Sequence, residues 1–99
     1  MNALNPRPKA LEDVCRRFHV KKVSLFGSAA RGELGPTSDI DVLVEFEPGQ
    51  APSLGGMVGL QDELEKIFGR KVDLATPSIL NNPYRRREIL KDLEELYAA

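Results

Sequence analysis

Apolar residues recur at helical spacing in three parts of the chain. The first part covers residues 11–18, where four apolar positions form one stripe of a short helix that ends near His19. The second runs through residues 57–67 and is followed by Gly69, at the place of a C-terminal cap. The third begins after Asn82-Pro83 and predicts a closing helix with an apolar stripe of Ile89, Leu90, Leu93, Leu96 and Tyr97.

Strand-like patterns separate these helices. Residues 23–26 predict a first strand that stops at Gly27-Ser28, and residues 29–31 predict one helical turn. A second strand is expected from Ser38 onward and a third at residues 70–75, while residues 47–56 predict a loop rich in proline and glycine. The order favours one α/β (α+β) domain, residues 1–99, with a small mixed β-sheet and helices packed on one face.

Composition narrows the class of protein. The chain has 99 residues, 41% of them apolar and 29% charged, which is typical of one soluble globular domain. The net charge of -1 gives no sign of direct nucleic-acid binding. The single cysteine, Cys15, excludes an internal disulfide and is expected in the core. No apolar run has membrane-spanning length and no secretion signal is visible, so we expect a cytoplasmic location and no membrane partner.

Candidate chemistry is concentrated in residues 27–41 and at one further aspartate. Gly27-Ser28 offers a small residue and a hydroxyl ahead of a short helix, which suits a phosphate. Strand residues two apart share a face, so Asp39 and Asp41 are expected side by side, with Asp73 on another strand. Three carboxylates can hold two Mg²⁺ ions, with Mn²⁺ as the alternative, and support transfer of a nucleoside monophosphate.

Each of these features also has a purely structural interpretation. Gly-Ser is a common turn, Asp-x-Asp can be two solvated carboxylates, and Asp73 can belong to a surface ion pair. Their combination favours a site, and other phosphate chemistries fit less well. The chain contains no P-loop, no G-x-G-x-x-G fingerprint and no EF-hand loop, and its only histidine leaves no Ser/His/Asp arrangement.

The segments 27–32 and 38–44 together resemble the signature of the minimal nucleotidyltransferases, which belong to the DNA polymerase β-type nucleotidyltransferase superfamily. The resemblance covers nearly the whole chain, since residues 72–74 match the strand of the third carboxylate and the closing helix matches the family's ending. It implies a polymerase β-like nucleotidyltransferase fold and ATP as substrate. It also implies which residues form the site. The metal ligands would be Asp39, Asp41 and Asp73, and Asp73 would help to deprotonate the acceptor. The nucleotide would be bound by Gly27, Ser28, Arg31 and Ser38.

The role of Arg31 stays open between two interpretations. Its guanidinium can bridge to a phosphate, or it can stabilise the loop through Glu33 or Asp39. The arginines at 85–87 are equally open, because they can form a solvated helix face or meet a phosphate or an acidic partner. The loop at residues 47–56 can be a lid or an ordinary connection.

The resemblance also implies a partner. Small proteins of this type are commonly paired with a HEPN-domain RNase toxin and act as its antitoxin, and some transfer AMP from ATP to a tyrosine of that toxin. A chain of 99 residues leaves no room for a domain that grips an acceptor, so a hetero-oligomer with a second protein is expected. The alternative is a module that neutralises its partner by binding alone, without catalysis. A third interpretation changes only the acceptor, to RNA or a small molecule.

Overall fold

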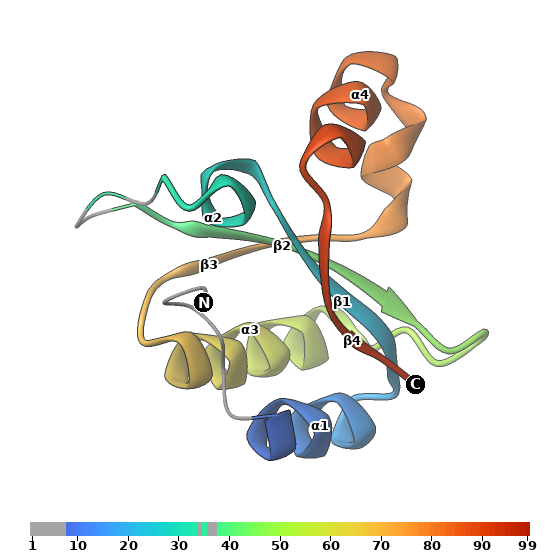
Figure 1. Cartoon of the computed structure of the whole chain (residues 1–99). Helices are drawn as coiled ribbons and strands as arrows, with labels where there is room; N and C mark the ends of the chain where they lie inside the picture. Colours follow the sequence, from blue (N-terminus) through green and yellow to red (C-terminus); the bar gives the residue numbers. More distant parts are fainter. Residues whose placement is uncertain (1–7, 34, 36–37) are drawn as a thin grey trace.

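The computed structural model describes residues 8–33, 35 and 38–99, in which helices and strands alternate along most of the chain (Figure 1). None of the helices in these residues is long and apolar enough to cross a membrane. In chain order the elements are α1 (Pro8–Arg17), β1 (Val20–Phe26), α2 (Gly27–Arg31), β2 (Ile40–Phe46), α3 (Leu54–Phe68), β3 (Val72–Ala75), the 3₁₀ helix η1 (Pro77–Asn81), α4 (Pro83–Lys91) and β4 (Glu94–Ala98).

The four strands of the described residues form one mixed sheet in the order β3-β2-β1-β4. Strand β1 is antiparallel to both β2 and β4, whereas β2 and β3 are parallel. Parallel neighbours need a crossover connection, and α3 supplies it between β2 and β3. The pairing of β2 with β3 therefore brings the segments that carry Asp41 and Asp73 to the same part of the sheet.

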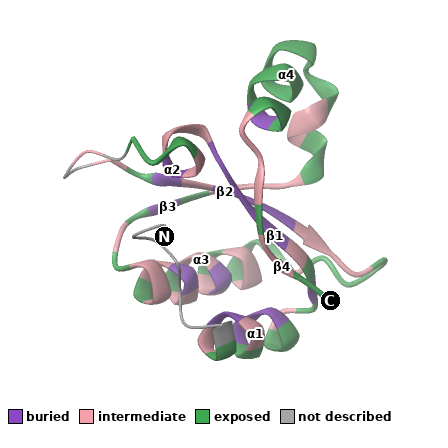
Figure 2. Cartoon of the chain, viewed as in Figure 1, coloured by how far each residue is buried: buried purple, intermediate pink, exposed green. Residues whose placement is uncertain are grey.

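Strand alternation divides the core between the two faces of the sheet. Val42 and Val44 point toward α1 and α3 and belong to the main apolar cluster. Leu43 points the other way and packs with Phe26 and Ile89 in a second, smaller cluster beneath α4. Figure 1 shows α1 and α3 on one side of the sheet and α4 on the other. In Figure 2 the buried residues follow β1 and β2, while α4 is mostly exposed.

The expected fold class, a small mixed α/β sheet with packed helices, is confirmed. The long helices α1 and α3 share one face as expected, whereas α4 packs on the opposite face. The predicted closing helix is wrong beyond Lys91, because the helix ends there and residues 94–98 form strand β4 on β1. Without β4 the backbone of β1 would present an unpaired edge, and pairing outweighs the helical spacing of the last apolar residues. Leu96 and Tyr97 still pack against the main core, but from a strand.

The loop expected at residues 47–56 is also shorter than predicted. Helix α3 begins at Leu54, and the Ser53 side chain caps it by accepting a hydrogen bond of 3.3 Å from the Gly56 N–H. A serine cap outweighs the low helix propensity of the glycines that follow it. The predicted C-terminal cap is confirmed, since Gly69 ends α3 in the left-handed conformation, with φ of 70°.

Candidate active site

Asp41 and Asp73 lie directly beside each other on the parallel strands β2 and β3, where they are register partners. Residues paired in this way point to the same face of a sheet. For these two it is the face opposite α1 and α3, because the neighbouring partners Ile40 and Val72 enter the main core. The fold therefore joins two carboxylates that are 32 positions apart in the sequence.

Gly27 lies against the carboxylate of Asp41 at the end of β1. A Cβ atom built on Gly27 would fall 2.6 Å from Asp41 Oδ2, which is closer than side chains tolerate. The backbone of Gly27 also has φ of 67°, in the left-handed region that favours glycine. Both features require glycine here, and together they allow the turn into α2 to approach Asp41.

A cavity of about 320 Å³ opens at this junction of β1, β2, β3, α2 and α4. Five residues that the sequence assigned to the site line it, together with four others. The nine lining residues are Phe26, Gly27, Ser28, Arg31, Asp41, Asp73, Arg85, Glu88 and Ile89.

A larger hollow of about 460 Å³ lies elsewhere, between α1 and α3. It is lined by residues of those helices only, among them Asp13, Arg17 and Glu63. None of the candidate site residues reaches it, and Arg17 and Glu63 already form an ion pair at 3.5 Å. Size alone therefore does not identify the chemical site, and the smaller cavity is the one that collects the candidate residues.

The environment of Asp41 disfavours its charge. Partial burial raises the pKa of Asp41, and the negative charges of Asp73 and Asp39 raise it further. The positive charges of Arg85 and Arg31 act in the opposite direction and lower that pKa, but the net shift is upward. A cation placed between the two paired carboxylates would relieve this repulsion.

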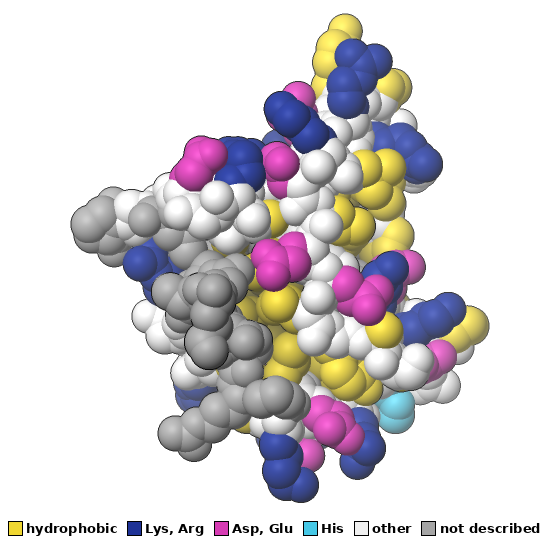
Figure 3. All heavy atoms as spheres, viewed as in Figure 1, with side chains coloured by type: hydrophobic (Ala, Val, Ile, Leu, Met, Phe, Trp, Pro, Cys, Tyr) yellow, Lys and Arg dark blue, Asp and Glu magenta, His cyan; other side chains and the backbone are white. Residues whose placement is uncertain are grey.

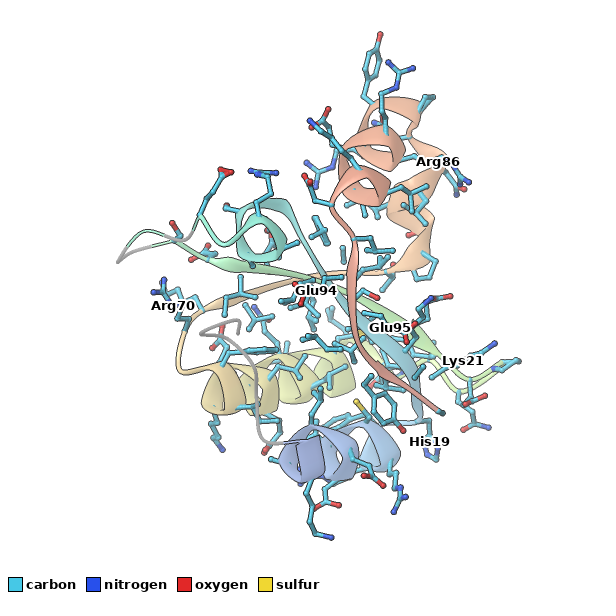
Figure 4. The ribbon with its side chains drawn as sticks, in the orientation of Figure 1. His19, Lys21, Arg70, Arg86, Glu94 and Glu95 are labelled. Atoms are coloured by element: carbon cyan, nitrogen blue, oxygen red, sulfur yellow. The ribbon has the colours of Figure 1, made fainter. Side chains whose placement is uncertain are left out.

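Asp39 and Ser38 differ from their predicted positions. The sequence placed both on the second strand, but β2 begins at Ile40, so Asp39 is exposed in the segment just before it. The Ser38 hydroxyl accepts a hydrogen bond of 2.9 Å from the Gly35 N–H and does not line the cavity. Arg70 holds the same segment, donating to the carbonyls of Gly35 at 2.6 Å and Ser38 at 3.3 Å (Figure 4).

Arg31 lines the cavity but is already engaged by two carboxylates. Its Nε donates to Glu33 Oε1 at 3.1 Å, and its Nη1 donates to Asp92 Oδ2 at 2.9 Å. The bond to Asp92 contributes most to raising the pKa of the guanidinium. One of the two interpretations from the sequence, stabilisation through Glu33, is therefore present in the structure, and Asp92 joins α2 to the end of α4.

The donor set suits a hard divalent cation. Asp41 and Asp73 supply paired carboxylate oxygens that repel each other. A bound Mg²⁺ or Mn²⁺ ion would neutralise this repulsion. Among the described residues, no three His, Cys, Asp or Glu side chains are already grouped as a metal site. Two of the three predicted ligands, Asp41 and Asp73, are thus adjacent, and Asp39 lies two residues before Asp41.

Helix α4 contributes residues that the sequence did not assign to the site. Arg85 and Glu88 line the cavity, whereas Arg86 points to the side of α4 that faces away from α2 (Figure 4). In Figure 3 the projection formed by α4 carries basic and hydrophobic side chains. The run of arginines at 85–87 was the available signal, but only the direction of α4 selects Arg85. Nothing in the sequence singles out Glu88.

A glycine turn packed against paired strand carboxylates, on a mixed sheet backed by two helices, defines a site of the nucleotidyltransferase class. The chain belongs to the nucleotidyltransferase domain family, whose model matches residues 7–96. A "putative protein adenylyltransferase" of Methanocaldococcus jannaschii is 44% identical over 90 residues, which cover 91% of this chain and 87% of that protein.

Solved structures support the same assignment. A structure described as a "putative minimal nucleotidyltransferase" has a TM-score of 0.69 and 34% identity, covering 88% of this chain and 86% of that one. The MNT antitoxin in complex with the tri-AMPylated HEPN toxin of Shewanella oneidensis has a TM-score of 0.64 at 18% identity, covering 100% of this chain and 74% of that chain. The expected polymerase β-like nucleotidyltransferase fold is therefore confirmed.

Proposed function

We propose that this chain transfers AMP from ATP to a hydroxyl group of a partner protein, with Mg²⁺ as cofactor. The observation that carries the proposal is the pairing of Asp41 with Asp73 against Gly27, in a cavity that also exposes basic side chains. Carboxylates for a divalent cation and a close backbone turn for phosphates are the two requirements of nucleotidyl transfer.

Each residue of the site has a separate role in the proposed reaction. The turn at Gly27, which lies against Asp41, binds the phosphate chain, and the Ser28 hydroxyl donates a hydrogen bond to a phosphate oxygen. The acceptor hydroxyl oxygen attacks the α-phosphorus, and the bond from that phosphorus to the pyrophosphate breaks. Asp73 takes the proton of the acceptor, since it lines the cavity beside Asp41 without an ion-pair partner recorded among the described residues.

Asp41 and Asp73, joined by Asp39, would hold two Mg²⁺ ions. When bound, the cations supply Lewis-acid polarisation of the phosphoryl oxygens and neutralise the leaving pyrophosphate. The raised pKa of Asp41 supports this assignment, because a carboxylate kept near other negative charges gains most from a cation. Asp39 would complete the set from the exposed segment before β2.

We propose a HEPN-domain toxin as the acceptor protein and one of its tyrosines as the modified residue, so that the chain acts as an antitoxin within a hetero-oligomer. The support comes from the comparisons: one relative is named a "putative protein adenylyltransferase", and one structural neighbour is an MNT antitoxin in complex with a tri-AMPylated HEPN toxin. The position of the cavity is compatible with this acceptor, since the exposed helix α4 forms one of its walls.

The test is a transfer reaction with a HEPN-domain toxin as the acceptor protein. The two proteins are incubated with ATP and Mg²⁺, and the mass of the HEPN protein is measured. We expect an increase corresponding to AMP with the wild-type chain and with the control Asp62→Asn, whose exposed carboxylate lies on α3. Asp41→Asn is expected to abolish the increase.

The same variants decide between catalysis and simple binding. If the chain neutralises its partner by binding alone, Asp41→Asn protects cells from the toxin as well as the wild type does. If modification is required, Asp41→Asn loses protection while Asp62→Asn keeps it. No added AMP on the partner with any variant, combined with full protection, would overturn the proposal in favour of a non-catalytic antitoxin.

A further inference from the structure

The cavity contains two arginines in contrasting surroundings. The guanidinium of Arg31 donates to both Glu33 and Asp92, at 3.1 and 2.9 Å, so its charge is balanced by two carboxylates. For the guanidinium of Arg85 no hydrogen bond or ion pair is recorded among the described residues, although it lines the same cavity. The charge of Arg85 acts on Asp41 only through space, so of the two arginines it is the one whose guanidinium N–H groups are available to an anion.

The backbone that carries Arg85 is held firmly. The Asn82 side chain caps α4, accepting hydrogen bonds from the N–H groups of Tyr84 at 3.0 Å and Arg85 at 3.3 Å. One turn further along, Ile89 is only 2% exposed and packs against Phe26 and Leu43 of the sheet. A cap and a buried anchor fix the side of α4 that faces the cavity, so Arg85 is presented from a rigid element.

The electrostatic surroundings of Arg85 combine acidic neighbours with an unfavourable position on its helix. Asp41, Asp73 and Glu88 are acidic, and Arg85 stands in the first turn of α4, where the helix dipole disfavours a cation. Its charge partly offsets that of Asp41, but its guanidinium forms no hydrogen bond or ion pair with the described residues, which leaves its N–H groups available to a ligand with negative charge. The planar guanidinium matches the geometry of phosphate oxygens.

We propose that Arg85, and not Arg31, is the arginine that binds the phosphate chain of the nucleotide. This inference rests on the proposed function, because it names a residue of the same nucleotide site. It reassigns the phosphate role that the motif gave to Arg31, whose side chain instead ties α2 to Asp92 at the end of α4. Arg85 lines the same cavity as the turn at Gly27 and Ser28, and in this proposal both contact the phosphates.

Binding measurements with the full chain test the assignment. ATP, ADP and AMP are titrated in the presence of Mg²⁺ into the wild type and into Arg85→Ala, Arg85→Lys, Arg31→Ala and Arg86→Ala. Arg86 is the matched control, since it is the next residue of α4 and points away from α2 (Figure 4). Loss of a charge-assisted hydrogen bond weakens binding by about 10- to 100-fold.

We expect Arg85→Ala to weaken ATP binding by about 10-fold or more, and to weaken AMP binding less, because fewer phosphates lose their partner. Arg85→Lys should recover part of the loss, since it keeps the charge but not the fork. Arg86→Ala should bind all three nucleotides as the wild type does. Arg31→Ala should lower the melting temperature while keeping the preference for ATP over AMP.

Three results would each have a distinct meaning. If the wild type binds no ATP, the proposed function fails and the assignment of Arg85 fails with it. If the wild type binds ATP while Arg85→Ala matches Arg86→Ala, only the inference about Arg85 is wrong. If Arg85→Ala weakens ATP and AMP equally, the side chain supports the fold of the site and does not contact the phosphate chain, which also overturns the inference.

Discussion

Asp41 and Asp73 occupy matching positions on the parallel strands β2 and β3, with their side chains on the face of the sheet that carries the cavity. Neither carboxylate has an ion-pair partner within the described residues, and the charge of Asp73 contributes to raising the pKa of Asp41. Such a pair lowers stability when both groups are ionised, and it suits binding of a divalent cation.

The first prediction concerns this repulsion. Because the pKa of Asp41 is raised in the folded state, its effect on stability is most favourable at acidic pH and is lost as the pH rises through the folded pKa. At neutral pH without divalent ions, Asp41→Asn should therefore melt at a higher temperature than the wild type. The same variant should transfer AMP at least about 100-fold more slowly, since even outer-shell changes at metal sites cost about 10- to 100-fold.

Thermal melting without Mg²⁺ measures the effect of the repulsion on stability, and melting with Mg²⁺ measures its relief by the cation. Mg²⁺ should raise the melting temperature of the wild type and leave that of Asp41→Asn nearly unchanged. A variant that melts lower than the wild type in metal-free buffer would show that the two carboxylates do not repel each other in the folded state.

The second prediction separates backbone strain from the close approach to Asp41. Gly27→Ala places a Cβ 2.6 Å from Asp41 Oδ2 in a backbone with φ of 67°, whereas Gly69→Ala has similar φ of 70° and nothing within 4 Å. Both should lose about 1–2 kcal/mol of unfolding free energy from the left-handed conformation. Only Gly27→Ala should also lose transfer activity, because Asp41 must move.

Urea denaturation and the transfer assay, applied to both glycine variants, test this expectation. Equal activity of the two variants would contradict the view that the contact between Gly27 and Asp41 matters for the site. A much larger stability loss for Gly69→Ala would show that strain at the cap of α3 dominates.

The third prediction concerns the ion pair of Arg31 and Asp92, which connects α2 with the end of α4. Asp92→Ala and Arg31→Ala should each lower the melting temperature, and the double variant should lose less stability than the sum of the two single losses, because the pair couples the two residues. Raising the salt concentration should reduce the coupling, because the pair is partly exposed. A coupling of zero in low salt would mean that the contact does not contribute to stability.

The fourth prediction concerns Cys15, which is fully buried in the main core. Burial raises the pKa of its thiol to about 12. Its contribution to stability is therefore complete below about pH 8.5, where an unfolded thiol is protonated, and is lost as the pH rises toward the folded value. Stability measured by urea denaturation should fall between about pH 9 and pH 11, and less so for Cys15→Ala.

Alkylation gives a second measurement of the same thiol. Labelling of native protein should be at least about 1,000-fold slower than labelling in denaturant, because exposure requires opening that costs about 5 kcal/mol or more. Rapid labelling of the native chain would show that Cys15 is accessible and is not a core residue.

Much of the site could be predicted from residues that are close together in the sequence. The turn at Gly27 and the aspartate at 41 follow local rules, since a glycine ends a strand and alternate strand residues share a face. The apolar stripes of α1 and α3 likewise follow helical spacing. Asp39 was harder to place, because the position at which β2 begins depends on pairing with β3 and not on local pattern.

The closing segment shows where local pattern fails. Leu93, Leu96 and Tyr97 fit a helical stripe, yet residues 94–98 pair with β1 and complete the sheet. A helix satisfies its own hydrogen bonds, but β1 can satisfy its outer edge only with another strand. These unpaired backbone groups exist only once the sheet has formed, so the local sequence pattern of residues 94–98 does not predict the pairing.

The amino-acid sequence by itself determined which chemical groups are present: the acidic pair, the third aspartate, the glycine turn and the apolar stripes that bury the sheet. The tertiary structure alone decided which of these groups meet and which cation faces them. Asp41 reaches Asp73 through a parallel register, and Arg85 faces the cavity because Ile89 anchors α4 on the sheet. The physical reason is that strand register and helix docking are set by contacts between distant segments, whereas turns and stripes are set by neighbouring residues.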